Sequence, residues 1–137
     1  MKNEEFDKLV EIAHALVNFD NRELRTFHVS FLMRNQRILS IGENIKKTHR
    51  INTRNKKYSE CGIDISSEKF ICSELDSIRK IKYGRIPFHK CKIVNIRLTR
   101  ENLLGCAAPC ESCQSLLKYY DISDIYFSND NQTFSKF

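Results

Sequence analysis

The sequence lacks the features that would place it in a membrane or route it out of the cell. No apolar run approaches the roughly 18 residues that a membrane helix needs. The first residues, MKNEEFDKLVEIAHAL, are acidic and periodic, without the basic and then apolar layout of a signal peptide. The four glycines form no phosphate-cradling motif, and we find no internal repeat or low-complexity tract. These absences predict a cytoplasmic protein with no membrane partner.

What is present indicates one folded domain over residues 1–137. Hydrophobic residues make up 41% of the chain and charged residues 29%, ordinary values for a globular protein. The formal net charge is +6, from 23 Lys+Arg against 17 Asp+Glu. Segment 46–57 (KKTHRINTRNKK) alone carries six of these cations and no acid. The sequence therefore predicts a neutral domain with one cationic loop.

Hydrophobic periodicity predicts a mixed sheet flanked by helices. Helical spacing predicts an amphipathic helix over 3–18, and alternation predicts a strand over 27–33 that turns at 35–36 into an antiparallel strand over 37–41. Segment 42–69 lacks periodicity and is predicted to be a long loop insertion. The remaining elements predicted are a helix over about 70–84, a strand over 91–98, a turn at 105–109, a helix from about 110, a strand over 122–128 and a short edge strand over 133–137.

Six cysteines carry the most chemical information. Without an export signal, reduced thiols are favoured over disulfides, and clustered reduced thiols bind metal or perform redox chemistry. Their sequence positions are Cys61, Cys72, Cys91, Cys106, Cys110 and Cys113.

Three of these cysteines fall where helices are predicted to begin. Cys72 opens the second helix, and Cys110 and Cys113 open the third at spacing i, i+3, which places both on one helix face. Helix N-termini stabilise thiolates. Three thiolates leave one tetrahedral position to water, the arrangement of catalytic zinc. Glu74, two residues after Cys72, does not share its helix face, and we interpret it as an acid–base group beside the metal rather than a ligand.

The pattern CSE at 72–74 with PCESC at 109–113 resembles the zinc signature of the cytidine deaminase superfamily. The resemblance covers residues 3–128, where the order of elements also matches, and it is to the three-cysteine type. Segment 42–49 (GENIKKTH) is similar to that of small phage-encoded cytidine or deoxycytidylate deaminase-like proteins.

The resemblance implies an α/β fold, a three-layer α/β/α domain with a mixed five-stranded sheet. It also implies a zinc-dependent deaminase that converts cytosine to uracil in a nucleoside or nucleoside monophosphate. Cys72, Cys110 and Cys113 would hold Zn²⁺ and a water, and Glu74 would carry a proton from that water to ring N3 and then to the leaving ammonia. The substrate contacts that we predict are Asn44, Ser73, Phe27 and Ala108.

Several of these expectations have alternatives. Asn44 has the alternative role of a turn residue after a strand, Phe27 that of a core residue, and we interpret His28 as packed or solvated. The resemblance departs at Leu75, because many three-cysteine nucleoside enzymes have an arginine directly after the glutamate. Another group, such as a helix dipole, must then offset the charge of three thiolates.

The cationic loop leaves the substrate class open. Lys46, Lys47, His49 and Arg50 are predicted to bind the 5′-phosphate of a nucleotide or the backbone of a single strand, with a solvated charge run as the alternative. One alternative function is therefore a cytosine deaminase of single-stranded DNA or RNA. A second is a non-catalytic zinc module that binds nucleic acid, with Cys61 or Cys106 as fourth ligand, and a thioredoxin-like redox pair is less favoured. We also expect a homo-oligomer.

Overall fold

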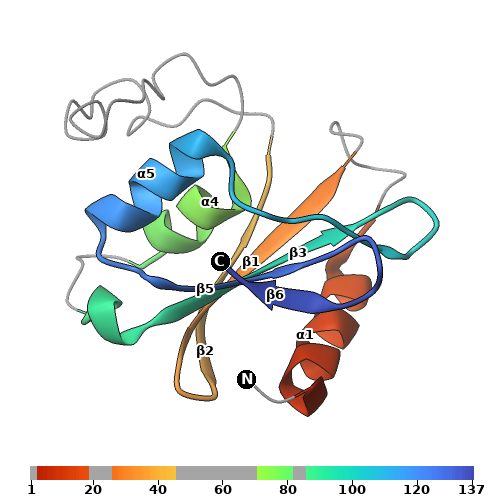
Figure 1. Cartoon of the computed structure of the whole chain (residues 1–137), viewed down its shortest axis with the longest axis horizontal. Coiled ribbons are helices and arrows are strands. Elements are labelled where there is room, and N and C mark those ends of the chain that lie inside the picture. Colours follow the sequence, from red (N-terminus) through yellow and green to blue (C-terminus); the bar gives the residue numbers. More distant parts are fainter. Residues whose placement is uncertain (1–2, 19–25, 46–70, 82–85) are drawn as a thin grey trace.

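A mixed β-sheet forms the middle layer of the molecule, with helices on both of its faces (Figure 1). The computed structural model describes residues 3–18, 26–45, 71–81 and 86–137. Its strands follow the order β2-β1-β3-β5-β6, and β4 pairs with β3 beside this path. The strands are β1 (Phe27–Arg34), β2 (Arg37–Glu43), β3 (Lys92–Leu98), β4 (Leu104–Gly105), β5 (Asp124–Ser128) and β6 (Phe134–Lys136).

The helices are α1 (Asn3–Leu16), α4 (Ser73–Arg79) and α5 (Glu111–Tyr119), with a short 3₁₀ helix η2 (Phe88–Lys90). Helix α1 covers one face of the sheet, and α4 and α5 lie together on the other (Figure 1). This is the predicted three-layer α/β/α arrangement. Within the described part of the chain, no helix combines the length and the apolar character that crossing a membrane requires.

Strand pairing follows the predicted pattern with one addition. Asn35, at φ 57°, makes the tight turn of the β1–β2 hairpin, because asparagine tolerates the left-handed region. Strands β3 and β5 are parallel, with α5 between them in sequence, and β6 pairs antiparallel with β5 as an edge strand. The five predicted strands are confirmed. The two-residue strand β4 is a sixth, formed where the chain reverses after β3 and Thr99 N–H bonds Leu103 O at 2.9 Å.

Alternation along the strands builds a separate core on each face. On β1, Phe27 and Phe31 point to the α1 side, whereas Leu32 packs on the opposite side, under α4 and α5. The central strand β3 contributes to both cores, with Val94 on the α1 side and Ile93 on the other. Its nearly continuous apolar sequence is typical of a strand that is covered on both faces. The α4–α5 core is the one that supports the cysteine-bearing helices.

The second predicted helix is shorter than the periodicity indicates. Ile71 forms an antiparallel bridge with Ile45, with N···O distances of 3.0 and 2.8 Å, so the helix begins only at Ser73. It ends at Arg79, and Lys80 caps it by bonding Ile78 O. The bridge also bounds the predicted loop, whose residues 46–70 lie outside the described residues.

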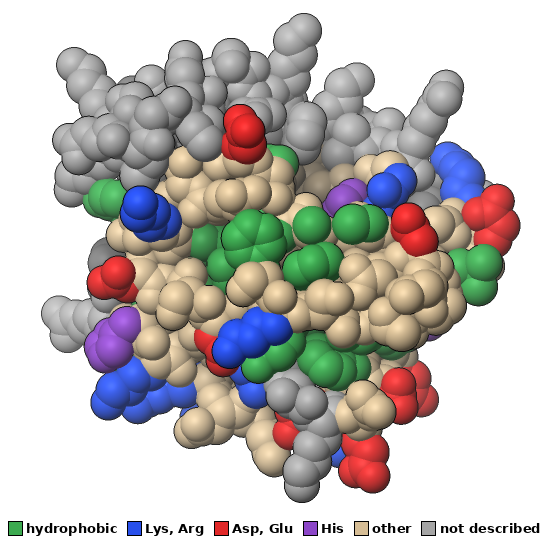
Figure 2. Space-filling view, viewed as in Figure 1, with side chains coloured by type: hydrophobic (Ala, Val, Ile, Leu, Met, Phe, Trp, Pro, Cys, Tyr) green, Lys and Arg blue, Asp and Glu red, His purple; other side chains and the backbone are tan. Residues whose placement is uncertain are grey.

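Hydrophobic side chains gather over the middle of the face seen in Figure 2, between α5 and β6. Phe137 is 53% exposed and its ring lies 6.3 Å from that of Phe127. Most charged side chains lie around the margin of this face, and a basic and an acidic side chain also lie directly below the patch (Figure 2). The molecule therefore has an apolar surface between α5 and β6.

Candidate active site and metal centre

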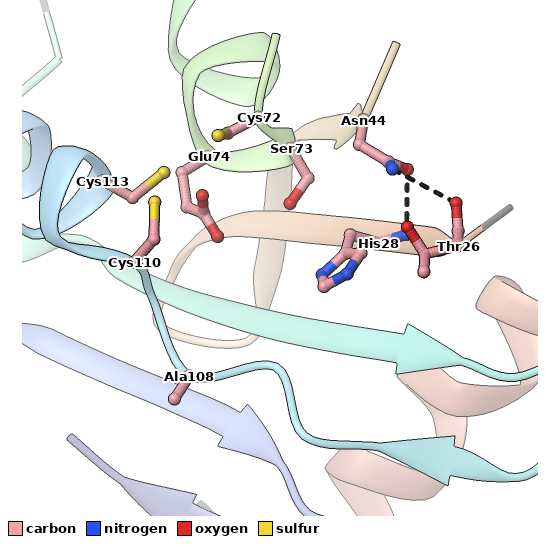
Figure 3. Close-up of a pocket in the computed structure, with 9 residues that line it drawn as sticks. All are labelled: Thr26, His28, Asn44, Cys72, Ser73, Glu74, Ala108, Cys110 and Cys113. Carbon is pink, nitrogen blue, oxygen red and sulfur yellow. Dashed lines mark hydrogen bonds between the residues drawn. The ribbon is translucent and has the colours of Figure 1, made fainter. Parts of the chain in front are cut away.

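The starts of α4 and α5 bring three sulfur atoms together. Cys72 and Cys110 occupy the N-cap positions of these helices in extended conformation, and Cys113 lies one turn into α5. The Sγ atoms of the three all lie within 4.8 Å of one another. Their side chains converge on one point in Figure 3. The spacing of the cysteines thus produces one cluster, as the sequence predicted.

The cluster fits a zinc ion in donor type, number and spacing. Zinc–thiolate bonds of about 2.3 Å place tetrahedral sulfurs roughly 3.8 Å apart, within the range of this cluster. Among the described residues, the cluster contains no fourth His, Cys, Asp or Glu ligand, and Cys106 lies exposed outside it. Cys61, the other fourth ligand considered, lies outside the described residues. The described residues thus supply three thiol ligands to one site, the number of protein ligands that catalytic zinc sites have.

The three thiols are electrostatically coupled. Hydrogen bonds with Cys113 and Cys72 lower the pKa of Cys110, and backbone N–H groups of Cys113 and Ser112 at the start of α5 lower it further. These two hydrogen bonds act in the opposite direction on the partners of Cys110: each raises the pKa of the other cysteine in the bond, Cys113 or Cys72. One thiolate therefore forms readily, whereas three adjacent thiolates require a cation to offset their repulsion. The helix start supplies part of the compensation that the sequence left open at Leu75.

Glu74 lies beside the sulfurs with its carboxyl group buried (Figure 3). Burial raises the pKa of Glu74 to about 7, although hydrogen bonds with Cys113 and Ser73 act in the opposite direction. A carboxyl group with this pKa can take up and release a proton near neutral pH. The position next to the cluster thus suits an acid–base group.

Helix α4 is seated closely against β2, which fixes the position of Cys72 and Glu74. A Cβ atom at Gly42 would lie 2.3 Å from Ser73 O and 2.2 Å from Ser77 N, so only glycine permits this approach. Ser40 Oγ donates to Ser77 O at 2.7 Å one pleat further along β2. The helix backbone therefore rests directly on the strand.

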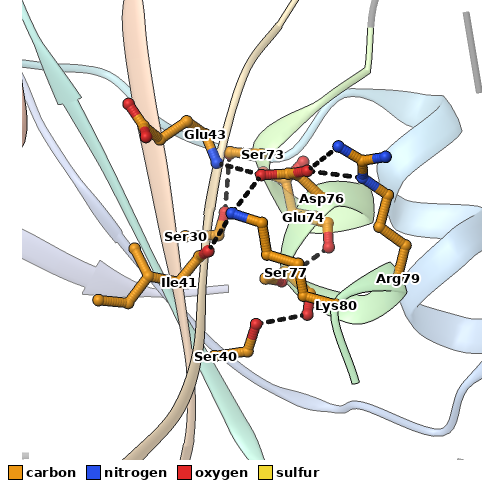
Figure 4. A network of polar contacts seen from close by, with 10 residues as sticks. All are labelled: Ser30, Ser40, Ile41, Glu43, Ser73, Glu74, Asp76, Ser77, Arg79 and Lys80. Atoms are coloured by element: carbon orange, nitrogen blue, oxygen red, sulfur yellow. Dashed lines mark hydrogen bonds and ion pairs between the residues drawn. The ribbon is translucent and has the colours of Figure 1, made fainter. Parts of the chain in front are cut away.

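A buried carboxylate, Asp76, joins α4 to the end of β2 (Figure 4). Its Oδ2 accepts the backbone N–H of Glu43 at 2.9 Å and pairs with Lys80 Nζ at 3.0 Å. Its Oδ1 lies 2.6 Å from both Nε and Nη2 of Arg79. Lys80 Nζ also donates to Ile41 O at 2.9 Å. This network connects the helix that carries Glu74 to the strand that ends next to Asn44.

A buried chain of hydrogen bonds connects Ser73 to the sheet beneath α4. Its Oγ lies 2.7 Å from Ser30 Oγ on β1, and Ser30 donates to Asn95 Oδ1 on β3 at 2.7 Å. The hydroxyl of Ser73 thus holds the CSE segment to the sheet while the residue lines the pocket.

The pocket has a volume of about 200 Å³ and extends from the sulfurs toward the start of β1 (Figure 3). Asn44 forms part of its wall, with Oδ1 accepting His28 N–H at 2.9 Å and Nδ2 donating to Thr26 O at 3.2 Å. The residues that line the pocket are Thr26, His28, Asn44, Cys72, Ser73, Glu74, Ala108, Cys110 and Cys113.

Most of the predicted site residues that the structure describes meet in this pocket, but Phe27 does not. Its ring is fully buried in the α1-side core, because the pleat of β1 turns it to the face opposite the pocket. This corrects the expected substrate contact in favour of the core alternative. Lys46, Lys47, His49 and Arg50 lie outside the described residues.

Two pocket residues were missed in the sequence. His28 lies on the pocket face of β1, and Thr26 immediately precedes the strand. Alternation correctly puts His28 on the face opposite Phe27. No sequence signal indicated that the second face carries the pocket, because that depends on where α4 and α5 dock.

No known family profile matches the sequence, and no curated protein sequence matches it significantly. Several solved structures are similar in fold, among them two deaminases. One is the dCMP deaminase of cyanophage S-TIM5 in complex with dCMP and dUMP, with a TM-score of 0.56 and 16% identity over 94% of this chain and 84% of that chain. The other is cytidine deaminase of Burkholderia pseudomallei, with a TM-score of 0.58 and 13% identity over 100% of this chain and 92% of that chain.

At such low identity the likeness concerns the fold. It agrees with the predicted layers, the mixed sheet and the two helices whose starts carry the cysteines. The chain therefore has the α/β fold of the cytidine deaminases, as the CSE and PCESC motifs predicted.

Proposed function

We propose that this chain is a zinc-dependent hydrolytic deaminase that converts cytosine to uracil in a nucleoside or nucleoside monophosphate. The observation that carries the proposal is the buried carboxyl group of Glu74 beside three converging cysteine sulfurs in one pocket. A structural zinc site has no need of such a carboxyl group. The deaminase fold supports the same activity.

Cys72, Cys110 and Cys113 would hold the metal. When bound, zinc acts as a Lewis acid and makes water a nucleophile at neutral pH. The reaction consumes one water and one cytosine and yields uracil and ammonia. Glu74 takes the proton of the attacking water at its carboxylate, delivers it to ring N3 and then moves a proton to the departing amino group. Burial of Glu74 supports this role because it raises the pKa toward neutrality.

The remaining pocket residues would bind and orient the nucleoside. We propose Asn44, whose amide is oriented by its hydrogen bonds to β1, as a sugar contact, and Ser73 and Ala108 as the walls around the base. The pocket volume of about 200 Å³ lies below the roughly 300–1,000 Å³ typical of drug-sized ligands and suits a small substrate.

The wider setting follows from the sequence and stays a prediction. Residues 46–57 would add positive charge near the pocket, because the bridge between Ile45 and Ile71 lies next to Asn44 and Cys72. We further propose a cytoplasmic enzyme that forms homo-oligomers. The apolar face between α5 and β6 supports oligomer formation.

The test is turnover by purified protein of known zinc content. Deoxycytidine, cytidine, dCMP and a cytosine-containing oligonucleotide are assayed by the ultraviolet absorbance change on deamination. We expect monomer turnover that Glu74→Gln removes while zinc remains bound, and that the exposed control Glu101→Gln retains. Turnover of the oligonucleotide alone would favour the polynucleotide alternative. A Glu74→Gln variant with bound zinc and unchanged activity would refute catalysis at this site.

A further inference from the structure

Arg97 lies on β3 next to His28, which lines the pocket, although Arg97 itself is not among the lining residues. In the sheet, Arg97 is opposite His28 of β1 on one side and opposite Gly105 of β4 on the other. Residues directly opposed in antiparallel strands carry their side chains on the same face. Arg97 therefore shares the sheet face of His28, which lines the pocket. On its other side, Gly105 begins the segment that leads through the pocket residue Ala108 to the start of α5.

The backbone of Gly105 makes room for the arginine side chain. A Cβ atom at Gly105 would lie 3.0 Å from Arg97 Cδ, 3.2 Å from its Cγ and 3.3 Å from its Nε. The aliphatic stem of Arg97 thus packs on bare backbone, and the side chain is half-buried. Among the residues that the structure describes, packing on Gly105 and not an ion pair sets the position of Arg97.

The guanidinium of Arg97 has no partner among the described residues. Its Nε is buried and makes no hydrogen bond. Other cations with partly buried side chains are paired, Arg79 with Asp76 and Lys92 with Glu5. A buried donor without an acceptor is unfavourable. An anion bound beside Arg97 would therefore accept a hydrogen bond from this group, which no described protein group accepts.

The layout of the pocket indicates which anion this is. The sulfurs and Glu74 lie at one end, and Thr26, His28 and Asn44 lie toward the other (Figure 3). A nucleoside with its base at Glu74 would direct its sugar toward Asn44 and His28, and a group attached beyond the sugar would lie toward Arg97. Guanidinium groups bind phosphate through two parallel hydrogen bonds.

We propose that Arg97 binds the phosphate of a pyrimidine nucleoside monophosphate and makes the monophosphate the preferred substrate over the free nucleoside. This inference rests on the proposed function and narrows its substrate class. It assigns phosphate recognition to a residue on the sheet, independently of the cationic segment 46–57.

The experiment compares ligands that differ only in the phosphate. Wild type, Arg97→Gln, Arg97→Lys and the control Arg37→Gln are assayed on dCMP and deoxycytidine for kcat and KM. Binding of the products dUMP and deoxyuridine is measured by calorimetry, which requires no turnover. Arg37 is exposed at the hairpin end of β2, away from the pocket, and its variant loses the same charge.

We expect Arg97→Gln to raise the KM for dCMP and the Kd for dUMP about tenfold or more, the loss expected for a charge-assisted bidentate contact. Deoxycytidine and deoxyuridine should change less than about twofold, which also shows that the variant is folded and that its pocket is intact. Arg97→Lys should retain part of the preference, because it keeps the charge without the planar fork. Arg37→Gln should match wild type with all four ligands.

The inference would be overturned if Arg97→Gln weakened the nucleotide and the matching nucleoside equally, or if it left the KM for dCMP unchanged. The protein would then be a deaminase whose substrate preference other residues determine. A wild type that binds dUMP no better than deoxyuridine would overturn it as well, as would a single-stranded oligonucleotide bound in preference to dUMP. A wild-type protein that neither binds nor converts any of these ligands would refute the proposed function and, with it, this inference.

Discussion

The contact between Gly42 and α4 allows a demanding test of how the site is built. Gly42→Ala adds one methyl group where the nearest atoms are helix backbone, at 2.2 Å from Ser77 N and 2.3 Å from Ser73 O. Ordinary contacts of a Cβ atom begin near 3.4 Å. The helix must therefore move by about 1 Å, because no flexible side chain is available to yield.

The expected loss of stability follows from that displacement. Overpacking against a rigid neighbour costs about 1–3 kcal/mol. A 1 Å shift also stretches the 2.9 Å bond from Glu43 N–H to Asp76, and hydrogen bonds to charged groups contribute about 1.5–3 kcal/mol. Replacing glycine by alanine also stabilises the folded state by about 0.4–1 kcal/mol, because it lowers the conformational entropy of the unfolded chain. The free energy of unfolding should fall by about 3 kcal/mol.

The same displacement should separate Cys72 from the two cysteines of α5. Urea unfolding gives the stability change, read at constant m-value, and metal analysis of the purified protein gives zinc per chain. A misplacement of about 1 Å can lower kcat roughly a hundredfold. Gly105→Ala is the matched control, because its nearest neighbour is the flexible side chain of Arg97, and its stability loss should stay below about 1 kcal/mol. A Gly42→Ala protein within about 0.5 kcal/mol of wild type, with full zinc, would refute this account of the helix seat.

Two further predictions concern the network and the metal. Asp76→Asn should lower the free energy of unfolding by about 1.5–3 kcal/mol, since it removes a buried charge that three groups contact. Asp124→Asn weakens a largely exposed pair with Lys136 and should change the free energy of unfolding by less than about 1 kcal/mol. Equal effects of the two substitutions in urea unfolding would contradict the role of Asp76. Cys113→Ser should lose bound zinc on dialysis, whereas Cys91→Ser, buried outside the cluster, should retain one zinc per chain. Full zinc in the Cys113→Ser protein would exclude Cys113 as a ligand.

The sequence predicted the cluster of three cysteines because its signals are local. Cys72 and Cys110 stand where hydrophobic periodicity changes, so the helix starts could be located, and i, i+3 spacing put Cys113 beside Cys110. Alternation likewise put Phe27 and His28 on opposite faces of one strand. It could not show that the pocket lies on the other face, with His28, because that depends on the docking of helices far along the chain.

Asp76 and β4 were beyond prediction for a related reason. A carboxylate in a short helix indicates a solvated position, but Asp76 is buried because the backbone N–H of Glu43 and two cations meet it. Strand β4 has only two residues, too few for any periodicity, and exists through its pairing with β3. Both depend on contacts between residues distant in sequence, which composition and spacing do not encode.

The bridge between Ile45 and Ile71 has a consequence for how this protein can change during evolution. Two hydrogen bonds of 3.0 and 2.8 Å close the chain on itself at the border of the pocket. The entropic cost of closing a loop grows only with the logarithm of its length, about 0.6 kcal/mol for each doubling. The cost of bringing Ile45 and Ile71 together therefore changes little with the number of residues that the chain carries between them. We expect related chains to differ in length here without displacing Asn44 and Cys72, which lie directly beside the bridge.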